Sequence, residues 1–297
     1  MKKMAFLIAI TCVLLMVLSF SFREMHSMDN QINSLHGIQN YVVYYNMITP
    51  EALGRITAYD MAIINIDGVT RDVLNRLKAS NTMVYSYVSL VSVEKTDALK
   101  NALMKEEDYL YVDGEKVYNP VYDCFQGNIL SENYENILMQ IIEERVIKPG
   151  FHGVFFDTLD EIEYLEDPAL KQLQLDAYMT FYKKLKVRYP GLSIIQNRGF
   201  SLYIQGASNY LDGLIYEDLH YDKATHTPED EYVYNHLTCI ANRDDNVLMA
   251  ISHENRQENY AFCLEHGWPY YYSSYSNNYL EFEGPIDSVI QKQQSRQ

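Results

Sequence analysis

The stretch FHGVFFDTLDE, residues 151–161, decides the fold. It is an apolar run of strand length, entered through Pro149-Gly150, that breaks abruptly into carboxylates. Such a run predicts a strand buried on both faces, as in parallel sheets. Ligands of α/β folds bind at the carboxyl ends of these strands, so Asp157 and Asp160 are placed for chemistry. The alternative is that one of them only caps the following helix.

On both sides of this strand, strand-like and helix-like segments alternate. The further predicted strands are residues 41–45, 61–66, 83–90, 192–197, 211–217, 247–251 and 269–272. Helices are expected from residue 50 and over 70–79, 131–146, 168–188, 229–242 and 255–266. Eight strands with intervening helices predict an α/β fold of the (β/α)8 TIM-type barrel, with its catalytic face at the strand carboxyl ends. A doubly wound open sheet is the alternative, because a strand count does not prove closure.

Residues 91–130 interrupt this rhythm and are rich in tyrosine. Within them, Asp113-Gly114 is typical of a tight β-hairpin turn. We therefore expect an insertion after the third strand.

The amino terminus predicts export. Lys2 and Lys3 precede an uncharged run over residues 4–22, which Arg23 ends. This predicts a signal peptide or membrane anchor in residues 1–22; an uncleaved anchor is favoured because the run approaches the roughly 20 residues that span a bilayer. Residues 23–40 are polar and aperiodic and predict a tether, and residues 41–297 form the barrel domain. The domain is therefore expected to be extracytoplasmic, either secreted or anchored to the cell membrane by residues 4–22.

Composition and motifs exclude several classes of function. Acidic residues exceed basic ones by 40 − 24 = 16, which argues against a nucleic-acid surface and suits a cationic or neutral partner. Beyond the apolar segment, the cysteines Cys124, Cys239 and Cys263 have no metal or redox spacing. The chain contains no GxGxxG, GxxxxGK[ST], HExxH or GxSxG motif, so we expect no nucleotide cofactor, no metal and no serine esterase.

Polar residues stand at the strand ends, which converge on one mouth in a closed barrel. Asp157 follows the fourth strand and Glu217 the sixth. Two carboxyl groups flanking a scissile bond are the arrangement that glycoside hydrolysis uses. Because Glu217 follows an apolar strand, burial is expected to raise its pKa toward that of a proton donor. The candidate substrate-binding residues are Asp160, Asn197, Glu94, Ser89, Asp218, Tyr44 and Tyr275.

Four segments together resemble the bacterial endo-α-1,4-polygalactosaminidase family, glycoside hydrolase family 114 and its relatives. Residues 153–160, GVFFDTLD, are similar to the family signature G-[VL]-F-[LF]-D-T-x-D, and residues 87–90, 194–199 and 212–218 follow in the expected order. The resemblance implies a (β/α)8 barrel that cleaves, within the chain, polysaccharides containing galactosamine and N-acetylgalactosamine. It further implies Asp157 as nucleophile, Glu217 as general acid/base, and Asp160 and Asn197 in the sugar subsite. A partly deacetylated polymer of this kind carries ammonium groups, which suits the acidic chain.

The chain departs from the family pattern after the third strand. There the family has S-[LI]-G-E-x-E, whereas residues 89–94 read SLVSVE. Val91 and Ser92 thus replace a glycine and a carboxylate, while Glu94 remains. Two hypotheses follow: an exported hydrolase of an amino-sugar exopolysaccharide, or a non-catalytic polysaccharide-binding member of a cell-surface synthesis or export system.

Overall fold

The computed structural model describes residues 34–67, 69–222 and 227–283. The predicted signal or anchor segment and most of the tether lie outside these residues. Gly37–Gln297 form one compact unit, and the description below concerns this unit. None of the helices in the described ranges is both long and apolar enough to cross a membrane.

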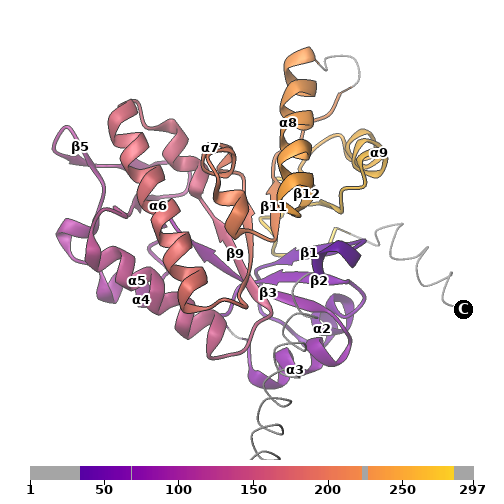
Figure 1. Ribbon diagram of the computed structural model, residues 1–297. Coiled ribbons are helices and arrows are strands. Elements are labelled where there is room, and N and C mark those ends of the chain that lie inside the picture. Colours follow the sequence, from indigo (N-terminus) through magenta and orange to yellow (C-terminus); the bar gives the residue numbers. More distant parts are fainter. Residues whose placement is uncertain (1–33, 68, 223–226, 284–297) are drawn as a thin grey trace, which may run out of the picture. The chain divides into compact units, whose positions relative to one another are not determined.

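Eight parallel strands form the core of this unit (Figure 1). They pair in the order β1-β2-β3-β9-β10-β11-β12-β13, so each strand lies beside its sequence neighbours among the eight. Their bounds are β1 Tyr41–Tyr44, β2 Met61–Ile64, β3 Met83–Ser89, β9 Gly153–Asp157, β10 Ser193–Asn197, β11 Gly213–Tyr216, β12 Val247–Ser252 and β13 Tyr270–Tyr272. All eight predicted strands are thus confirmed, and the sheet is a nearly closed barrel of the TIM type.

Helices follow the strands on the outside of the barrel. The helices are α2 Pro50–Ile56, α3 Arg71–Ala79, α5 Glu132–Ile142, α6 Pro168–Arg188, α7 Phe200–Ile204, α8 Pro228–Asp244 and α9 Arg256–His266, with the short turns η3 Glu143–Ile147, η4 Leu159–Tyr164 and η5 Ala207–Tyr210. A further short turn, η1 Ser34–Gly37, precedes β1 in the sequence. The predicted helix over 131–146 ends earlier as an α-helix, because its last turn widens into the π-helical η3.

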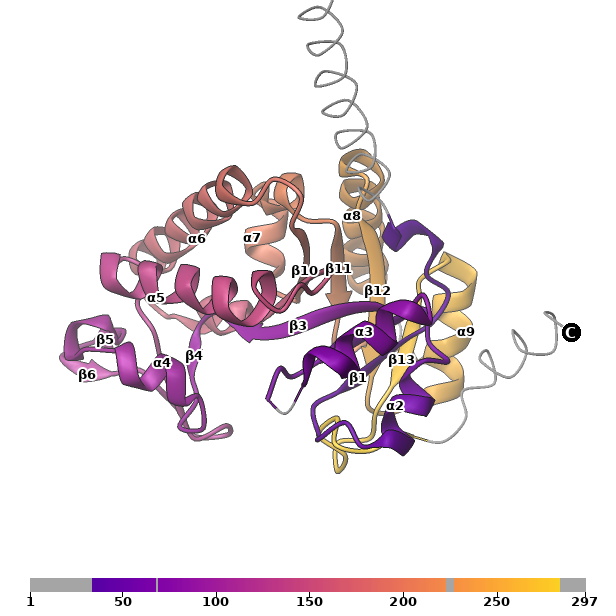
Figure 2. The ribbon, with the colours of Figure 1, turned by 90° about the horizontal axis from the view of Figure 1, so that it is seen from below.

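The insertion between β3 and α5 carries short elements of its own. These are β4 Ser92–Val93, α4 Ala98–Leu103, η2 Glu106–Asp108, β5 Tyr111–Val112, β6 Glu115–Lys116, β7 Tyr118–Asn119 and β8 Cys124–Gln126. The predicted hairpin turn is confirmed between β5 and β6, where Asp113 and Gly114 both have positive φ. Figure 2 shows α4, β5 and β6 on the side of the barrel away from α2 and α3.

Tyrosines fill much of the barrel interior. The Tyr41 hydroxyl in β1 donates to the Ala250 carbonyl in β12 at 2.8 Å. The Tyr85 and Ser193 hydroxyls, in β3 and β10, are 2.8 Å apart. Both rings are fully buried, so each supplies apolar area while its hydroxyl keeps a partner. The many tyrosines of the sequence are therefore partly barrel core.

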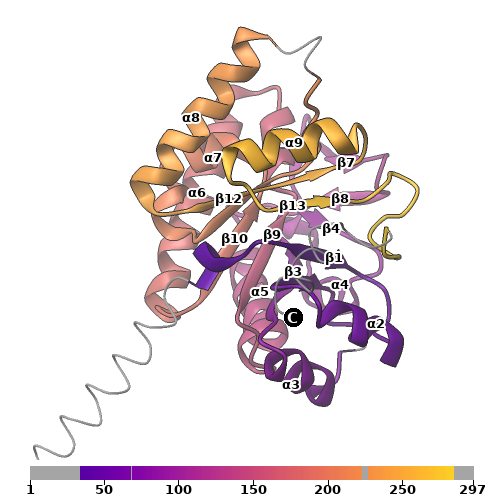
Figure 3. The same ribbon diagram turned by 90° about the vertical axis from the view of Figure 1, so that its right-hand side faces the viewer.

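The barrel closes where β13 lies beside β1 (Figure 3). No ladder of backbone hydrogen bonds joins these two strands, both of which lie within the described residues. Their contact rests instead on the Tyr271 hydroxyl, which donates to the Val43 carbonyl at 3.2 Å, and on the packing of the Tyr271 ring against Tyr41. Just beyond the strands, the Tyr45 N–H donates to the Tyr279 carbonyl at 2.8 Å. We call this line of contacts the seam.

Gly153 opens β9 at a point where no side chain fits. A Cβ there would lie 2.4 Å from the Ser193 carbonyl oxygen and 2.4 Å from a ring carbon of Tyr85. The first of these atoms is backbone of the neighbouring strand and the second belongs to the barrel core. Glycine therefore allows β9 to approach both β10 and the interior.

The Gly153→Ala substitution is expected to lower the free energy of unfolding by about 1–3 kcal/mol, since an added methyl group forces the packed core apart. Thermal unfolding followed by circular dichroism measures this. Gly54→Ala, in α2 with nothing within 4 Å of the added Cβ, is the matched control and should stabilise slightly. Equal melting temperatures for the two variants would contradict the tight packing at Gly153.

Candidate active site

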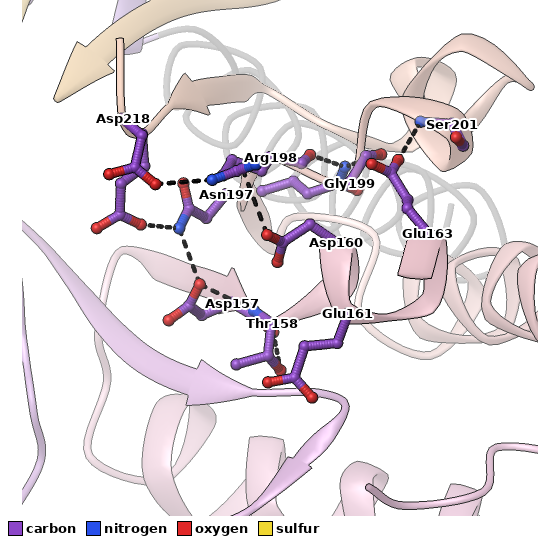
Figure 4. Close-up of polar contacts among 12 residues, drawn as sticks. Asp157, Thr158, Asp160, Glu161, Glu163, Asn197, Arg198, Gly199, Ser201 and Asp218 are labelled. Carbon is purple, nitrogen blue, oxygen red and sulfur yellow. Dashed lines mark hydrogen bonds and ion pairs between the residues drawn. The ribbon is translucent and has the colours of Figure 1, made fainter. Parts of the chain in front are cut away.

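One amide joins the two carboxyl groups predicted to be catalytic. The Asn197 Nδ2 atom, at the end of β10, donates to Asp157 Oδ1 at 2.8 Å and also to Glu217 Oε2. Asp157 ends β9 and Glu217 directly follows β11, so three consecutive strands of the barrel contribute to the group. Figure 4 shows Asn197 pointing to Asp157 across the mouth. The structure therefore brings together residues that are 20 and 40 positions apart in sequence.

The backbone turns sharply after each of these three residues. In every case the next residue is not glycine but has the left-handed conformation: Thr158, Arg198 and Asp218, with φ of 72°, 45° and 59°. Such residues cost about 1–3 kcal/mol each and persist where the surroundings hold them. After Asp157, such a stabilising contact is the hydrogen bond that the Thr158 N–H donates to Asp157 Oδ1 at 2.8 Å. At Thr158 the cost is thus offset by a bond that also fixes the Asp157 carboxyl group.

Glu217 has two further partners that sequence analysis did not select. The Tyr279 hydroxyl donates to Glu217 Oε1, and His253 Nε2 lies 3.5 Å from the same oxygen. His253 Nδ1 lies 2.5 Å from the Ser273 carbonyl. Since a carbonyl only accepts, Nδ1 carries a proton, and Nε2 is free to exchange one with Glu217. His253 directly follows β12, so its place at a strand end could have indicated a role at the site. Tyr279 lies beyond β13, and no sequence motif indicates that it reaches Glu217.

A guanidinium group holds the outer two acids. Arg198 Nη1 donates to Asp218 Oδ2 at 2.7 Å, and its Nε lies 3.3 Å from Asp160 Oδ2 (Figure 4). Both candidate substrate-binding acids are therefore joined to each other through Arg198, and Asp218 directly follows Glu217 in the sequence. Neither Asp157 nor Asp160 caps the following turn η4.

The environments of the central pair separate their pKa values. Burial and the charge of Glu217 raise the pKa of Asp157 to about 7. Burial also acts to raise the pKa of Glu217, but hydrogen bonds from His253, Tyr279 and Asn197 outweigh it and lower that pKa. The expected rise at Glu217 is therefore wrong, because an apolar strand before a residue does not reveal the donors that surround its side chain. Of the two carboxyl groups, Asp157 is therefore the one that stays protonated to higher pH.

The remaining predicted residues differ in how they meet this centre. Glu94 accepts from the Tyr87 hydroxyl at 3.0 Å. Tyr275 stacks on His253 with the ring centroids 4.6 Å apart. Ser89 is buried, and its hydroxyl bonds to Thr158 and to the Ser92 carbonyl, so its contacts are structural.

Tyr44 needs a correction. Its ring stacks on Phe282 with the centroids 4.6 Å apart, and it has no contact with the acids among the described residues. The next residue, Tyr45, lies at the site instead: its ring packs against Tyr279, which donates to Glu217, with the ring centroids 5.3 Å apart. Alternate residues of a strand point to opposite faces, so the error is one residue of register.

The departure from the family pattern at Val91 and Ser92 lies in a buried connection. The N–H groups of both residues donate to Thr158 Oγ1, at 2.9 and 3.1 Å. Lys100, which is 1% exposed, donates to the carbonyls of Ser89 and Ser92 at 2.8 Å each, and burial lowers its pKa to about 8. These bonds tie the start of the insertion to the end of β9.

The described residues contain no cluster of three or more His, Cys, Asp or Glu side chains that could hold a metal ion. The side chains that contact Glu217 are an amide, a tyrosine hydroxyl and an imidazole.

Comparison with known proteins identifies the family. Residues 33–250 match the model of glycoside-hydrolase family GH114. The chain belongs to this family. No curated protein matches. The GH114 match covers β1 to most of β12, and so includes Asp157, Asn197 and Glu217.

Solved structures resemble this GH114 chain in fold. The glycoside hydrolase domain of PelA from Pseudomonas aeruginosa has a TM-score of 0.68 and 18% identity, covering 84% of this chain and 98% of that one. Aspergillus fumigatus Ega3, in complex with galactosamine, has a TM-score of 0.59 and 14% identity, covering 80% of this chain and 91% of that one. At such identities the likeness establishes the barrel fold.

The pKa directions predict opposite effects of two substitutions on stability. For Asp157 the folded pKa exceeds the unfolded one, so its ionisation destabilises the fold as pH rises toward 7. For Glu217 the folded pKa is lower, so its ionisation stabilises the fold above the unfolded pKa and this is lost on acidification. At pH 8 we therefore expect Asp157→Asn to raise the melting temperature by several degrees and Glu217→Gln to lower it.

Calorimetry of both variants and the wild type between pH 4 and pH 8 measures these shifts. The Asp157→Asn difference should shrink as pH falls below 7. A lower melting temperature for Asp157→Asn at pH 8 would contradict the raised pKa.

Proposed function

We propose that the protein is an exported glycoside hydrolase that cleaves, within the chain, an exopolysaccharide containing galactosamine and N-acetylgalactosamine. The observation that carries the proposal is the Asn197 amide, which holds Asp157 and Glu217 side by side at the catalytic face of a GH114 barrel. Paired carboxyl groups at this face are what glycoside hydrolysis requires.

In the proposed mechanism Asp157 is the nucleophile. Its Oδ1 is held by Asn197 and by the Thr158 N–H, whereas Oδ2 accepts no hydrogen bond from the described residues and is free to attack the anomeric carbon. Glu217 gives its proton to the glycosidic oxygen as the C–O bond breaks, which leaves a glycosyl ester on Asp157. Glu217 then takes a proton from water, the water oxygen attacks the anomeric carbon, and Asp157 leaves as a carboxylate.

The shared amide also supports a stereochemical outcome. One nitrogen that contacts both carboxyl groups keeps their nearest oxygens within two hydrogen-bond lengths, about 6 Å at most. Retaining enzymes have their carboxyl groups about 5–5.5 Å apart, and inverting ones roughly 6.5–9.5 Å apart. We infer that the product keeps the anomeric configuration of the substrate.

The proposed roles need the opposite order of pKa values from that of the free protein. There the pKa of Asp157 is raised to about 7 and that of Glu217 is lowered, whereas the nucleophile must be ionised and the acid must be protonated. A positive charge close to a carboxyl group favours its ionised form. An ammonium group of galactosamine beside Asp157 would therefore lower the pKa of Asp157. The ionised Asp157 would in turn raise the pKa of Glu217, which supports a cationic substrate.

The surroundings of the pair suit an amino sugar. Four acids, Asp157, Asp160, Glu217 and Asp218, attract a cationic polymer. Asn197 is 2% exposed, and its Oδ1 has no hydrogen-bond partner among the described residues, so it offers an acceptor to a sugar hydroxyl or ammonium group. The galactosamine bound in the Ega3 complex supports the same substrate class. We propose that Asp160 and Asp218 line the sugar subsite with it.

We also propose that the barrel domain is exported from the cytoplasm. The apolar run over residues 4–22 is a signal peptide or an anchor, which would place the barrel outside the cytoplasm, where an exopolysaccharide is found.

The full-length protein should release oligosaccharides from partly deacetylated α-1,4-linked galactosamine polymer, detected by mass spectrometry. Asp157→Asn and Glu217→Gln should each lower the rate by about 10²–10⁴-fold, because each removes a group that acts in the transition state. Ser276→Ala, in the loop after β13, is the control and should retain activity. Full activity of the Asp157→Asn, Glu217→Gln double variant would refute the site.

The alternative is a non-catalytic polysaccharide-binding protein. The specific observation in its favour is Ser92, which stands where the family pattern has a carboxylate. It predicts binding of the same polymer with no product in the wild type.

Azide distinguishes the roles of the two acids. With an α-linked substrate that has an activated aryl leaving group, Glu217→Ala should form the α-glycosyl azide, because azide takes the place of water in the second step. Asp157→Ala should form the β-glycosyl azide by direct attack. Proton NMR of the products identifies both azides. For the wild type, spectra recorded before the released sugar equilibrates in water should show the α-anomer. The reverse pair of azides would exchange the two roles, and a β product from the wild type would exclude retention.

A further inference from the structure

An exposed tyrosine lies on a short turn of the insertion. The turn joins β7 to β8, and within it Val121 and Tyr122 are 79% and 74% exposed. Large apolar side chains held out in solvent side by side are unfavourable unless something covers them. The family resemblance gives this turn no role.

The inner side of the turn is bound to the catalytic face. Asn119 Nδ2 donates to Glu161 Oε1 at 3.2 Å, and Asn119 Oδ1 accepts from the N–H groups of Val121 and Tyr122 at 3.0 and 3.4 Å. Glu161 is only 7% exposed and stands next to Asp160, the partner of Arg198 (Figure 4). The turn is therefore tied to the same segment, η4, that follows the proposed nucleophile.

Ser92 strengthens this tie. Its hydroxyl donates to Glu161 Oε1 at 2.6 Å, beside the bond from Asn119. The serine that replaces a carboxylate of the family pattern thus has a partner of its own. It orients the acid to which the turn is attached.

The outer side of the turn is braced independently. Both oxygens of Asp123, the residue after Tyr122, lie 2.6 Å from Lys95 Nζ, and the Tyr118 hydroxyl donates to Asp123 as well. Tyr122 therefore projects from backbone held on both sides. Because the backbone is already ordered, a ligand that binds the ring has to order only the Tyr122 side chain.

The negative charge of the acid cluster extends to this tyrosine. Partial desolvation raises the pKa of Tyr122, and the charges of Glu217, Asp218, Asp157 and Asp160 add to the rise. The ring therefore lies within the electrostatic field of the catalytic face, although it belongs to the insertion.

We propose that Tyr122 forms an outer subsite, where its ring stacks on a sugar unit of the amino-sugar polymer beyond the bond that is cleaved, and that Asn119 and Glu161 are positioning residues for it. The class of ligand rests on the proposed function. A pyranose presents an apolar face of C–H groups to a ring, and an ammonium group is attracted both to the ring face and to the acids beside it. An extended polymer would reach this ring, whereas a short oligosaccharide that fills only the central subsites would not.

The test compares polymer with short oligosaccharide in the full-length protein. Tyr122→Ala should raise KM for the polymer about five- to tenfold with kcat unchanged, because the stacking energy is equal in the ground and transition states. KM for a galactosamine disaccharide with an aryl leaving group should stay within twofold. Tyr122→Trp should restore polymer binding.

Two matched variants separate the subsite from general effects. Tyr232→Ala removes a tyrosine that is 68% exposed on α8 and should change neither constant. Asn119→Ala releases the turn from Glu161 and should reproduce the polymer KM of Tyr122→Ala, again without a change in kcat.

Binding is measured separately from cleavage. Isothermal titration of the polymer into Asp157→Asn protein, with and without Tyr122→Ala, gives Kd without hydrolysis. A five- to tenfold weaker Kd supports the subsite even if the wild type cleaves nothing, which would refute only the hydrolase. An unchanged polymer Kd, or equal losses on polymer and disaccharide, would overturn the inference and leave Val121 and Tyr122 as a contact for another protein.

Discussion

The site depends on one hydrogen-bond donor shared by two acids. The Nδ2 atom of Asn197 lies between Asp157 and Glu217, and its two protons allow it to serve both. Without it, two partly buried carboxyl groups this close would repel each other and lose partners at the same time. The amide thereby sets the distance across which a glycosidic bond has to fit, and the parallel order β9-β10-β11 is what brings it there.

The fold could be predicted from the sequence because its signals are local. Each strand is a short apolar run with a turn before it, and the run that ends at Asp157 shows this most clearly. The central acids were found for the same reason, since a strand end is visible in the sequence. The one-residue error at Tyr44 arose because a strand of four residues with tyrosines at its end does not reveal which of them faces inward.

The other partners of the site depend on contacts that no local pattern encodes. Tyr279 reaches Glu217 from a segment 62 positions away, and its aromatic side chain looks like many others in a chain with 27 tyrosines. The pKa order of the central pair has the same origin, because it depends on donors from three separate segments of the chain. Tyr122 is linked to Glu161 only through Asn119 of the insertion, whose path the sequence does not predict.

The seam has a consequence for how the protein fluctuates. A barrel opens most readily where its strands share the fewest backbone hydrogen bonds, and here that place is between β13 and β1. The bond from Tyr45 to the Tyr279 carbonyl lies at this place, and Tyr279 also holds Glu217. Opening of the seam, which amide hydrogen exchange measures, and loss of the Tyr279 bond to Glu217 are therefore coupled. A ligand that bridges Asp157 and Glu217 would therefore slow amide hydrogen exchange in both β1 and β13, the first and last strands of the barrel.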